Sequence, residues 1–176
     1  KEDLERFQCI FAKNEGAVTA PATGLHFSRE MMKRMEIYDI ASAFIALHCG
    51  LSNFRNTDVE DLTKHKMDSE EMFITRENCD IVNNAKDAGH KIVAVGTTVQ
   101  RAIETAADTL GHINPFEGWT NKFIFPPYKF QVADAMFSNF QLPESTLLML
   151  TAAFGNFDYT MNAYKVALKE DYKFGP

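Results

Sequence analysis

The chain has 176 residues, of which 45% are hydrophobic, and a formal net charge of −6 at pH 7. This length fits one domain with a sizeable core. The acidic balance counts against a strong electrostatic grip on nucleic acid, which usually leaves a basic footprint. No apolar run reaches the roughly 18 residues of a membrane-spanning helix. The three cysteines, Cys9, Cys49 and Cys79, show neither metal-ligand nor disulfide spacing, which favours a reducing cytoplasm.

In the first half of the chain, hydrophobic patterning predicts strands that alternate with helices. Ser28 and Thr75 are expected to cap helices, and Gly89 to stop the second of them. The expected elements are a strand at 8–12, a helix from 29 to about 38, a buried strand at 41–48, a polar loop from 50 to about 57, a strand at 71–74 and a helix ending at 88.

In the second half, a strand followed directly by a turn and a helix predicts a βα unit with parallel pairing nearby. The class is therefore mixed α/β. The expected elements are a strand at 91–95, a helix from 99 to about 109, strand candidates at 123–125 and 135–140, and helices at 145–154 and 159–169.

The turn Gly96-Thr97-Thr98 places free backbone N–H groups at the start of a helix, where they favour an anion, a carboxylate or a ribose hydroxyl. The alternative is a tight turn followed by a cap. No Gly-Lys-Ser/Thr follows, so it is not a Walker loop. Arg101 and Glu104 lie three apart and are expected to form a surface ion pair. In a functional interpretation, Arg101 holds a carboxylate or a phosphate.

Other candidate residues have structural or functional interpretations. His26, between two apolar neighbours, is typical of a hydrogen-bonded structural residue, whereas His48 ends an apolar strand beside a loop, where functional groups often project. The titratable cluster of His65, Asp68 and Glu70 is typical of a solvated loop. Trp119, in a Gly-Trp-Thr loop, either fills a core or stacks on an RNA base. The loop at 139–143 is placed to present polar side chains to a pocket.

Long strings of low degeneracy carry a resemblance to a known family. They are Pro21-Ala22-Thr23-Gly24-Leu25-His26-Phe27, His65-Lys66-Met67-Asp68-Ser69-Glu70, Val95-Gly96-Thr97-Thr98, Gly118-Trp119-Thr120-Asn121-Lys122-Phe123-Ile124-Phe125-Pro126-Pro127 and Asn139-Phe140-Gln141-Leu142-Pro143. From about Phe11 to its last residue, the chain resembles the S-adenosylmethionine:tRNA ribosyltransferase-isomerases of queuosine biosynthesis. Family members are about twice as long. Residues 1–176 are therefore expected to be the main α/β domain, from the C-terminal half of such a protein, without its N-terminal part and its second domain. The family fold implies a sheet partly closed into a barrel with flanking helices.

The resemblance implies an enzyme that transfers and isomerises the ribosyl moiety of S-adenosylmethionine. The acceptor is 7-aminomethyl-7-deazaguanine at the wobble position of a tRNA with a GUN anticodon. The products are epoxyqueuosine in the tRNA, adenine and methionine. The sulfonium acidifies the neighbouring ribose carbon, so that one positioned base can remove its proton. S-adenosylmethionine is a co-substrate, and neither a cofactor nor a metal is expected.

Matching positions imply the site residues. His26 and His48 are expected in acid–base or hydrogen-bonding roles, and Glu70 as a carboxylate at the aminomethyl group or as a base. Substrate binding is expected from Thr97, Thr98, Arg101, Trp119 and Gln141.

Gln141 stands where the family has histidine. An amide does not titrate near neutral pH and so cannot act as a proton carrier, but it can donate a hydrogen bond. Gln141 therefore motivates a second reading, a tRNA-binding relative without catalysis. A third reading is an unrelated nucleotide-binding α/β domain built around the Gly96 turn.

Overall fold

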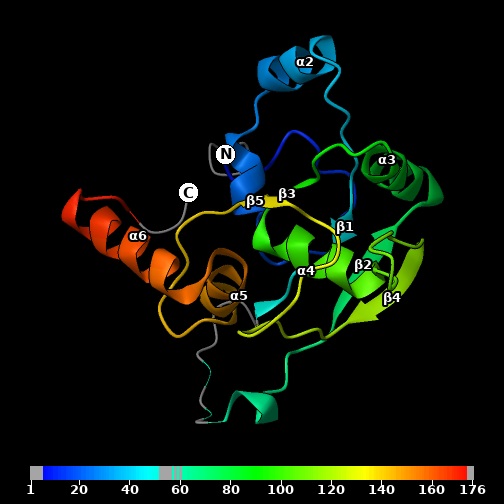
Figure 1. Cartoon of the computed structure of the whole chain (residues 1–176). Helices are drawn as coiled ribbons and strands as arrows, with labels where there is room; N and C mark the ends of the chain where they lie inside the picture. The colour runs from blue at the N-terminus through cyan, green and yellow to red at the C-terminus, as the bar shows by residue number, and fades with distance from the viewer. Residues whose placement is uncertain (1–5, 52–56, 58, 60, 174–176) are drawn as a thin grey trace.

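The computed structural model describes residues 6–51, 57, 59 and 61–173 (Figure 1). The mixed α/β class predicted from the sequence is confirmed. The helices are α2 (Arg29–Ile37), α3 (Arg76–Asp87), α4 (Thr97–Ala106), α5 (Thr146–Gly155) and α6 (Phe157–Lys169), the 3₁₀ helices are η1 (Ala22–His26) and η3 (Leu62–Lys64), and the strands are β1 (Ala46–Leu47), β2 (Glu70–Ile74), β3 (Val93–Val95), β4 (Phe116–Thr120) and β5 (Ala135–Phe137).

The strands form one three-stranded and one two-stranded sheet. In the first, β2 lies between β1 and β4 and pairs with both in antiparallel fashion. In the second, β3 and β5 run parallel, which confirms the parallel pairing predicted near the βα unit. Across the described residues both sheets are open, which differs from the partly closed barrel that the resemblance suggested.

Helix α4 lies at the centre of the molecule, between the parallel pair and the antiparallel sheet, and α5 packs beside it (Figure 1). The apolar residues Ala102 and Ile103 of α4 belong to the hydrophobic core that the two sheets share. The same helix buries four polar side chains, each at most 5% exposed: Thr97, Gln100, Arg101 and Glu104. Because burying a polar group is costly unless it is hydrogen-bonded, the partners of these four residues are informative.

Three helices begin at side-chain caps, two of which, Ser28 and Thr75, were predicted. The hydroxyl of Ser28 accepts a hydrogen bond from the N–H of Met31 at 3.1 Å. Thr75 and Ser145 accept in the same way at the starts of α3 and α5. Gly89 follows α3 with φ +78, in the left-handed region that favours glycine, as its predicted role as a stop requires.

Several strand predictions were wrong. Residues 8–12 form a turn closed by the Ala12 N–H on the Cys9 carbonyl, and of 41–48 only Ala46–Leu47 is paired. Residues 123–125 are not a strand; the rings of Phe123 and Phe125 pack together instead, just before two prolines that lack N–H donors. Strand β4 was missed because Glu117 and Gly118 are poor strand formers. These residues adopt a strand because they pair with β2. Residues 52–56 of the predicted polar loop lie outside the described residues.

Helix length and polarity bear on membrane association. Among the described residues, no helix combines the length and the apolar character that crossing a membrane requires.

Candidate functional site

The parallel strands β3 and β5 end side by side, and their carboxyl ends form one edge of the two-stranded sheet. Gly96 follows β3 immediately, and Phe137 is the last residue of β5. The Gly96 N–H donates to the Phe137 carbonyl at 2.9 Å. Gly96 has φ +106, which an L side chain rarely adopts, and α4 begins at the next residue. The edge therefore presents a helix N-terminus with unsatisfied N–H groups. Open α/β sheets bind ligands in the crevice outside such strand ends.

Two further segments reach this edge. A side-chain carbon added at Gly96 would lie 3.9 Å from the side chain of Thr23 in η1, so η1 approaches the turn closely. At the other end of η1, the exposed ring of His26 places Nε2 3.0 Å from Oδ1 of Asn139, which follows β5. The structure thus brings His26 and the 139–141 loop to the same edge as the turn that opens α4. Asn139 was not among the predicted site residues; its place in the matching 139–143 loop was the only signal for it.

Gln141 makes its contacts inside this loop. Its side-chain Nε2 donates to the Ser138 hydroxyl at 2.9 Å and to the Asn139 carbonyl at 3.0 Å. Its backbone N–H donates to the Tyr164 hydroxyl at 2.6 Å, and burial raises the pKa of that phenol. Hydrogen-bond donation of this kind needs no titratable group, so an amide can perform it.

A second polar group lies one helical turn further along α4. The Arg101 guanidinium pairs through Nη2 with the Glu70 carboxylate, and both side chains are at most 2% exposed. The other carboxylate oxygen of Glu70 accepts the Gly50 N–H at 3.0 Å. The predicted surface pair of Arg101 with Glu104 and the solvated-loop reading of Glu70 were therefore wrong. Glu70 opens β2 on its inward face, and α4 is buried rather than exposed.

Several buried polar atoms around these groups have no hydrogen-bond partner within the part of the chain that the structure describes. They are Nε and Nη1 of Arg101, both amide atoms of Gln100, Nδ2 of Asn139 and Oγ1 of Thr146. Unsatisfied buried polar groups are rare in folded proteins. The unpartnered N–H donors of Arg101 lie beside its ion pair with Glu70, which has no net charge. Such donors are suited to a polar ligand that supplies acceptor atoms.

A second buried carboxylate, that of Glu104, has all its acceptor positions used within the protein. It accepts the N–H of Gln131 at 2.9 Å, the N–H of Val132 at 3.0 Å and the hydroxyl of Tyr128 at 3.0 Å. Burial, and then the nearby Glu104 carboxylate, raise the pKa of Tyr128. Glu104 therefore holds the 128–132 segment in place and offers nothing to a ligand.

Two predicted site residues lie apart from the Glu70 carboxylate. The His48 ring packs edge-on against Phe73, with ring centroids 6.0 Å apart. Phe73 projects from the face of β2 opposite to Glu70, because side chains alternate along a strand. Trp119 lies in β4 rather than in a loop and is 65% exposed, so its interpretation as a core residue is wrong.

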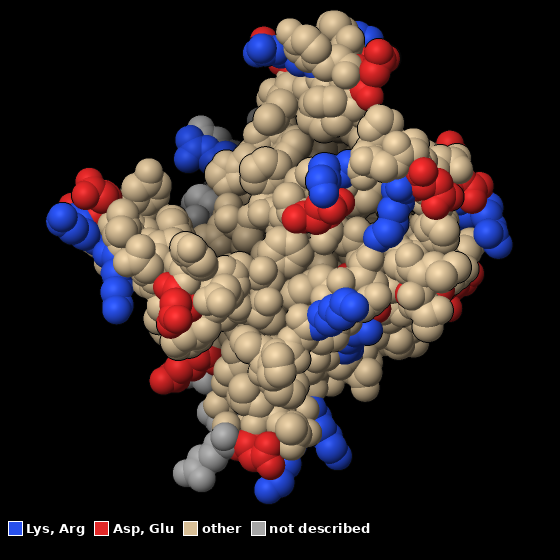
Figure 2. Space-filling view, viewed as in Figure 1, with Lys and Arg blue, Asp and Glu red and all other residues tan. Residues whose placement is uncertain are grey.

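The distribution of charged and metal-ligating side chains bears on which ligands the chain can bind. On the face drawn in Figure 2, basic and acidic side chains are interspersed over a mainly uncharged surface. Within residues 6–51, 57, 59 and 61–173, no three His, Cys, Asp or Glu side chains are grouped so that they could hold a metal ion.

Comparison with known proteins shows extensive similarity. The family described as queuosine biosynthesis protein matches residues 1–176. An S-adenosylmethionine:tRNA ribosyltransferase-isomerase of Phocaeicola vulgatus is 68% identical over 99% of this chain, and one of Bacteroides fragilis is 67% identical over 99%. The chain spans about half the length of these relatives, 50% of each.

A solved structure shares the fold. The crystal structure of an S-adenosylmethionine tRNA ribosyltransferase from Thermotoga maritima aligns with a TM-score of 0.71 and 34% sequence identity, covering 88% of this chain and 49% of that one. The reading as an unrelated nucleotide-binding domain is thereby excluded. The chain belongs to the queuosine biosynthesis protein family.

Proposed function

We propose that the protein carrying this chain transfers and isomerises the ribosyl moiety of S-adenosylmethionine onto 7-aminomethyl-7-deazaguanine in tRNA. Epoxyqueuosine in the tRNA, adenine and methionine are the products. The observation that carries the proposal is the 68% identity, over 99% of the chain, to a relative named for this reaction class. Residues 1–176 form the main α/β domain of that protein in this proposal, and a part beyond them completes it.

The edge beside β3 and β5 supports binding of S-adenosylmethionine. Thr97 and Thr98 open α4, where free N–H groups and the helix dipole favour a carboxylate or a ribose hydroxyl. Arg101, one turn further on, keeps buried N–H donors that are not used by Glu70. In this proposal, these three residues hold the polar groups of S-adenosylmethionine.

The chemistry requires a base, a positioned amine and exclusion of water. His26 uses Nε2 in its hydrogen bond with Asn139, and its ring is exposed at the edge. We assign it the removal of the proton from the ribose carbon next to the sulfonium. Glu70, held by Arg101 and the Gly50 N–H, is the carboxylate that receives the aminomethyl group. Collapse of the ribose then expels adenine, and the aminomethyl nitrogen captures the sugar carbon.

The assignments of His48, Trp119 and Gln141 rest on other grounds. His48 matches a family position and keeps its acid–base or hydrogen-bonding role as a proposal. The exposed Trp119 ring is available to stack on a tRNA base, which aromatic residues commonly do in RNA recognition. Gln141 contributes through the loop that it braces. The partner is a tRNA with a GUN anticodon, in the cytoplasm, and the reaction uses no metal or redox cofactor.

The test uses a complete protein, of the length of the curated relatives, that carries this chain. It is incubated with S-adenosylmethionine and tRNA containing 7-aminomethyl-7-deazaguanine, while adenine release and nucleoside mass are followed. Adenine together with epoxyqueuosine supports the enzyme and shows that Gln141 is compatible with catalysis. Tight tRNA binding without either product favours the non-catalytic relative instead.

The predicted base stacking has its own check. Replacing Trp119 with alanine is expected to weaken tRNA binding while leaving the melting temperature within about 2 °C, because the ring buries little surface. Filter binding and thermal denaturation measure the two effects. An unchanged tRNA affinity contradicts the stacking role.

A further inference from the structure

The hydrogen bond between His26 and Asn139 joins two segments that are 113 residues apart in the sequence. It lies at the edge where β3 and β5 end. The bond is local to neither segment, since His26 ends the 3₁₀ helix η1 and Asn139 belongs to the loop after β5. A contact of this kind exists only in the folded protein, and it joins a predicted catalytic residue to one that was not among the predicted site residues.

The chemistry of the two groups determines where the proton lies. The side-chain oxygen Oδ1 of Asn139 can only accept, so Nε2 of His26 must carry the hydrogen. In the neutral ring, the other nitrogen, Nδ1, then holds a lone pair. The exposed ring leaves that lone pair within reach of a substrate at the edge.

Asn139 is itself held from several directions. Its backbone carbonyl accepts the Ser138 hydroxyl at 3.0 Å and the Gln141 side-chain amide at 3.0 Å. Two residues earlier, the Phe137 carbonyl accepts the N–H of Gly96, the residue before α4. The asparagine therefore has a defined position relative to the helix N-terminus. Its Nδ2 is buried and has no partner among the described residues.

We propose that Asn139 is a positioning residue for the reaction, and the inference rests on the proposed function. Its Oδ1 keeps His26 in the Nε2–H tautomer, with Nδ1 turned to the substrate. Nδ1 takes the proton from the ribose carbon, the electron pair of the C–H bond stays on that carbon, and the ring becomes an imidazolium. The Nε2–H bond to Oδ1 persists and stabilises that charge. Gln141 acts through Asn139 by donating a hydrogen bond to its carbonyl, and it transfers no proton itself.

The kinetic test compares two asparagine-to-leucine variants of the complete protein. Asn139→Leu removes the acceptor for His26 and is expected to lower kcat for adenine release at least about 10-fold, with a small change in KM. The melting temperature should change little, because among the described residues the Asn139 side chain makes only its exposed hydrogen bond to His26.

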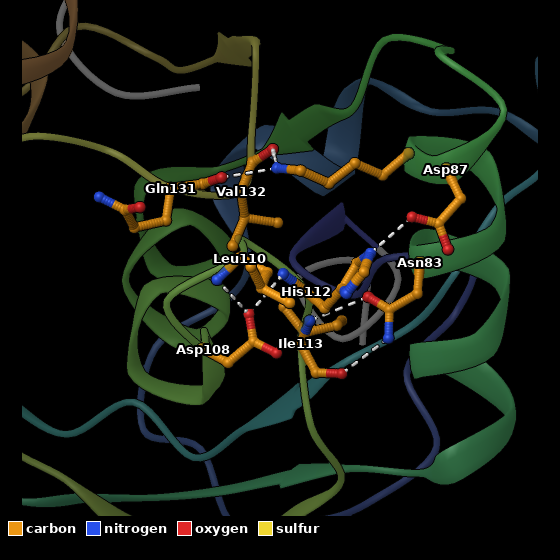
Figure 3. Close-up of polar contacts among 9 residues, drawn as sticks. Asn83, Asp87, Asp108, Leu110, His112, Ile113, Gln131 and Val132 are labelled. Atoms are coloured by element: carbon orange, nitrogen blue, oxygen red, sulfur yellow. Dashed lines mark hydrogen bonds and ion pairs between the residues drawn. The ribbon is translucent and has the colours of Figure 1, made fainter.

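Asn83→Leu is the matched control (Figure 3). Its Nδ2 donates to the Ile113 carbonyl and its Oδ1 accepts the Ile113 N–H, both at 2.9 Å. Loss of these two hydrogen bonds should lower the melting temperature and leave kcat unchanged. If Asn139→Leu keeps the wild-type kcat, or lowers only the melting temperature as Asn83→Leu does, Asn139 is a structural residue and the proposal is overturned.

A double variant separates action through His26 from an independent effect. When two residues act as a unit, their effects on kcat are not additive. Asn139→Leu added to His26→Ala should therefore lower kcat no further, whereas multiplied effects contradict the positioning role. Asn139→Asp retains an acceptor oxygen and is expected to restore most of the kcat that Asn139→Leu loses.

A measurement without turnover distinguishes failure of this proposal from failure of the proposed reaction. Nitrogen and carbon chemical shifts of the His26 ring, assigned with His26→Ala, report its tautomer. The Nε2–H form is expected in the wild type and a mixture in Asn139→Leu. A wild-type protein with the Nδ1–H form overturns the role of Asn139 even if adenine is released. A wild-type protein that releases no adenine overturns the reaction, while the ring shifts still decide the tautomer.

Discussion

Helix α4 carries two buried charged groups that differ in how completely they are satisfied. Near its end, Glu104 receives three hydrogen bonds from the 128–132 segment. One turn earlier, Arg101 pairs with Glu70 yet keeps buried N–H atoms without a partner, and neighbouring Gln100 has both amide atoms unpaired among the described residues. The charged side chains of both groups are at most 2% exposed, so burial alone does not separate structure from function. The saturated group holds a loop, and the unsaturated one is suited to receive a ligand.

The largest effect is expected from Arg101→Met. It leaves the Glu70 carboxylate buried without its cation, and removal of one partner of a buried ion pair costs about 3–5 kcal/mol. The double variant Glu70→Gln/Arg101→Met should recover much of this stability, because no lone charge remains. Adenine release should stay lost in both variants. Urea denaturation and the adenine assay measure the two effects, and a double variant with wild-type turnover would show that the pair is only structural.

Glu104→Gln tests the saturated side of the comparison. The new amide places N–H donors against the backbone N–H groups of Gln131 and Val132, and we expect a loss of about 2 kcal/mol in the free energy of unfolding. Turnover per folded molecule should not change. Glu117→Gln, an exposed carboxylate on β4, is the control and should stay within about 0.5 kcal/mol. A large fall in turnover of folded Glu104→Gln would erase the distinction between the two regions.

The smallest effect concerns Tyr128 and alkaline pH. Burial and the Glu104 carboxylate raise the pKa of Tyr128 above its ordinary value of about 10. The folded state therefore keeps a proton that the unfolded state releases, and the stabilisation is complete below pH 10 and declines above it. Tyr128→Phe should reduce the loss of stability between about pH 10 and 11. Tyr159→Phe, an exposed tyrosine, is the control, and equal slopes for Tyr128→Phe and the wild type would contradict the prediction.

Local features of the fold were predictable from the sequence. The caps at Ser28, Thr75 and Ser145 and the stop at Gly89 involve groups within a few residues of each other. Strand β4 was missed for the opposite reason: its residues are poor strand formers, and only pairing with β2, some 46 residues earlier, makes them a strand. The predicted Arg101–Glu104 pair failed similarly, since three-residue spacing says nothing about whether a helix face meets water or another strand.

The sequence by itself determined the family, the mixed α/β class and the starts of α2, α3 and α5. These depend on long matching strings and on interactions that span one helical turn. Only the tertiary structure decided that Glu70 pairs with Arg101, that Trp119 is exposed, and that Asn139 holds His26. Each of these depends on contacts between segments that packing brings together, and neither composition nor periodicity encodes which distant group a buried charge or a histidine ring will meet.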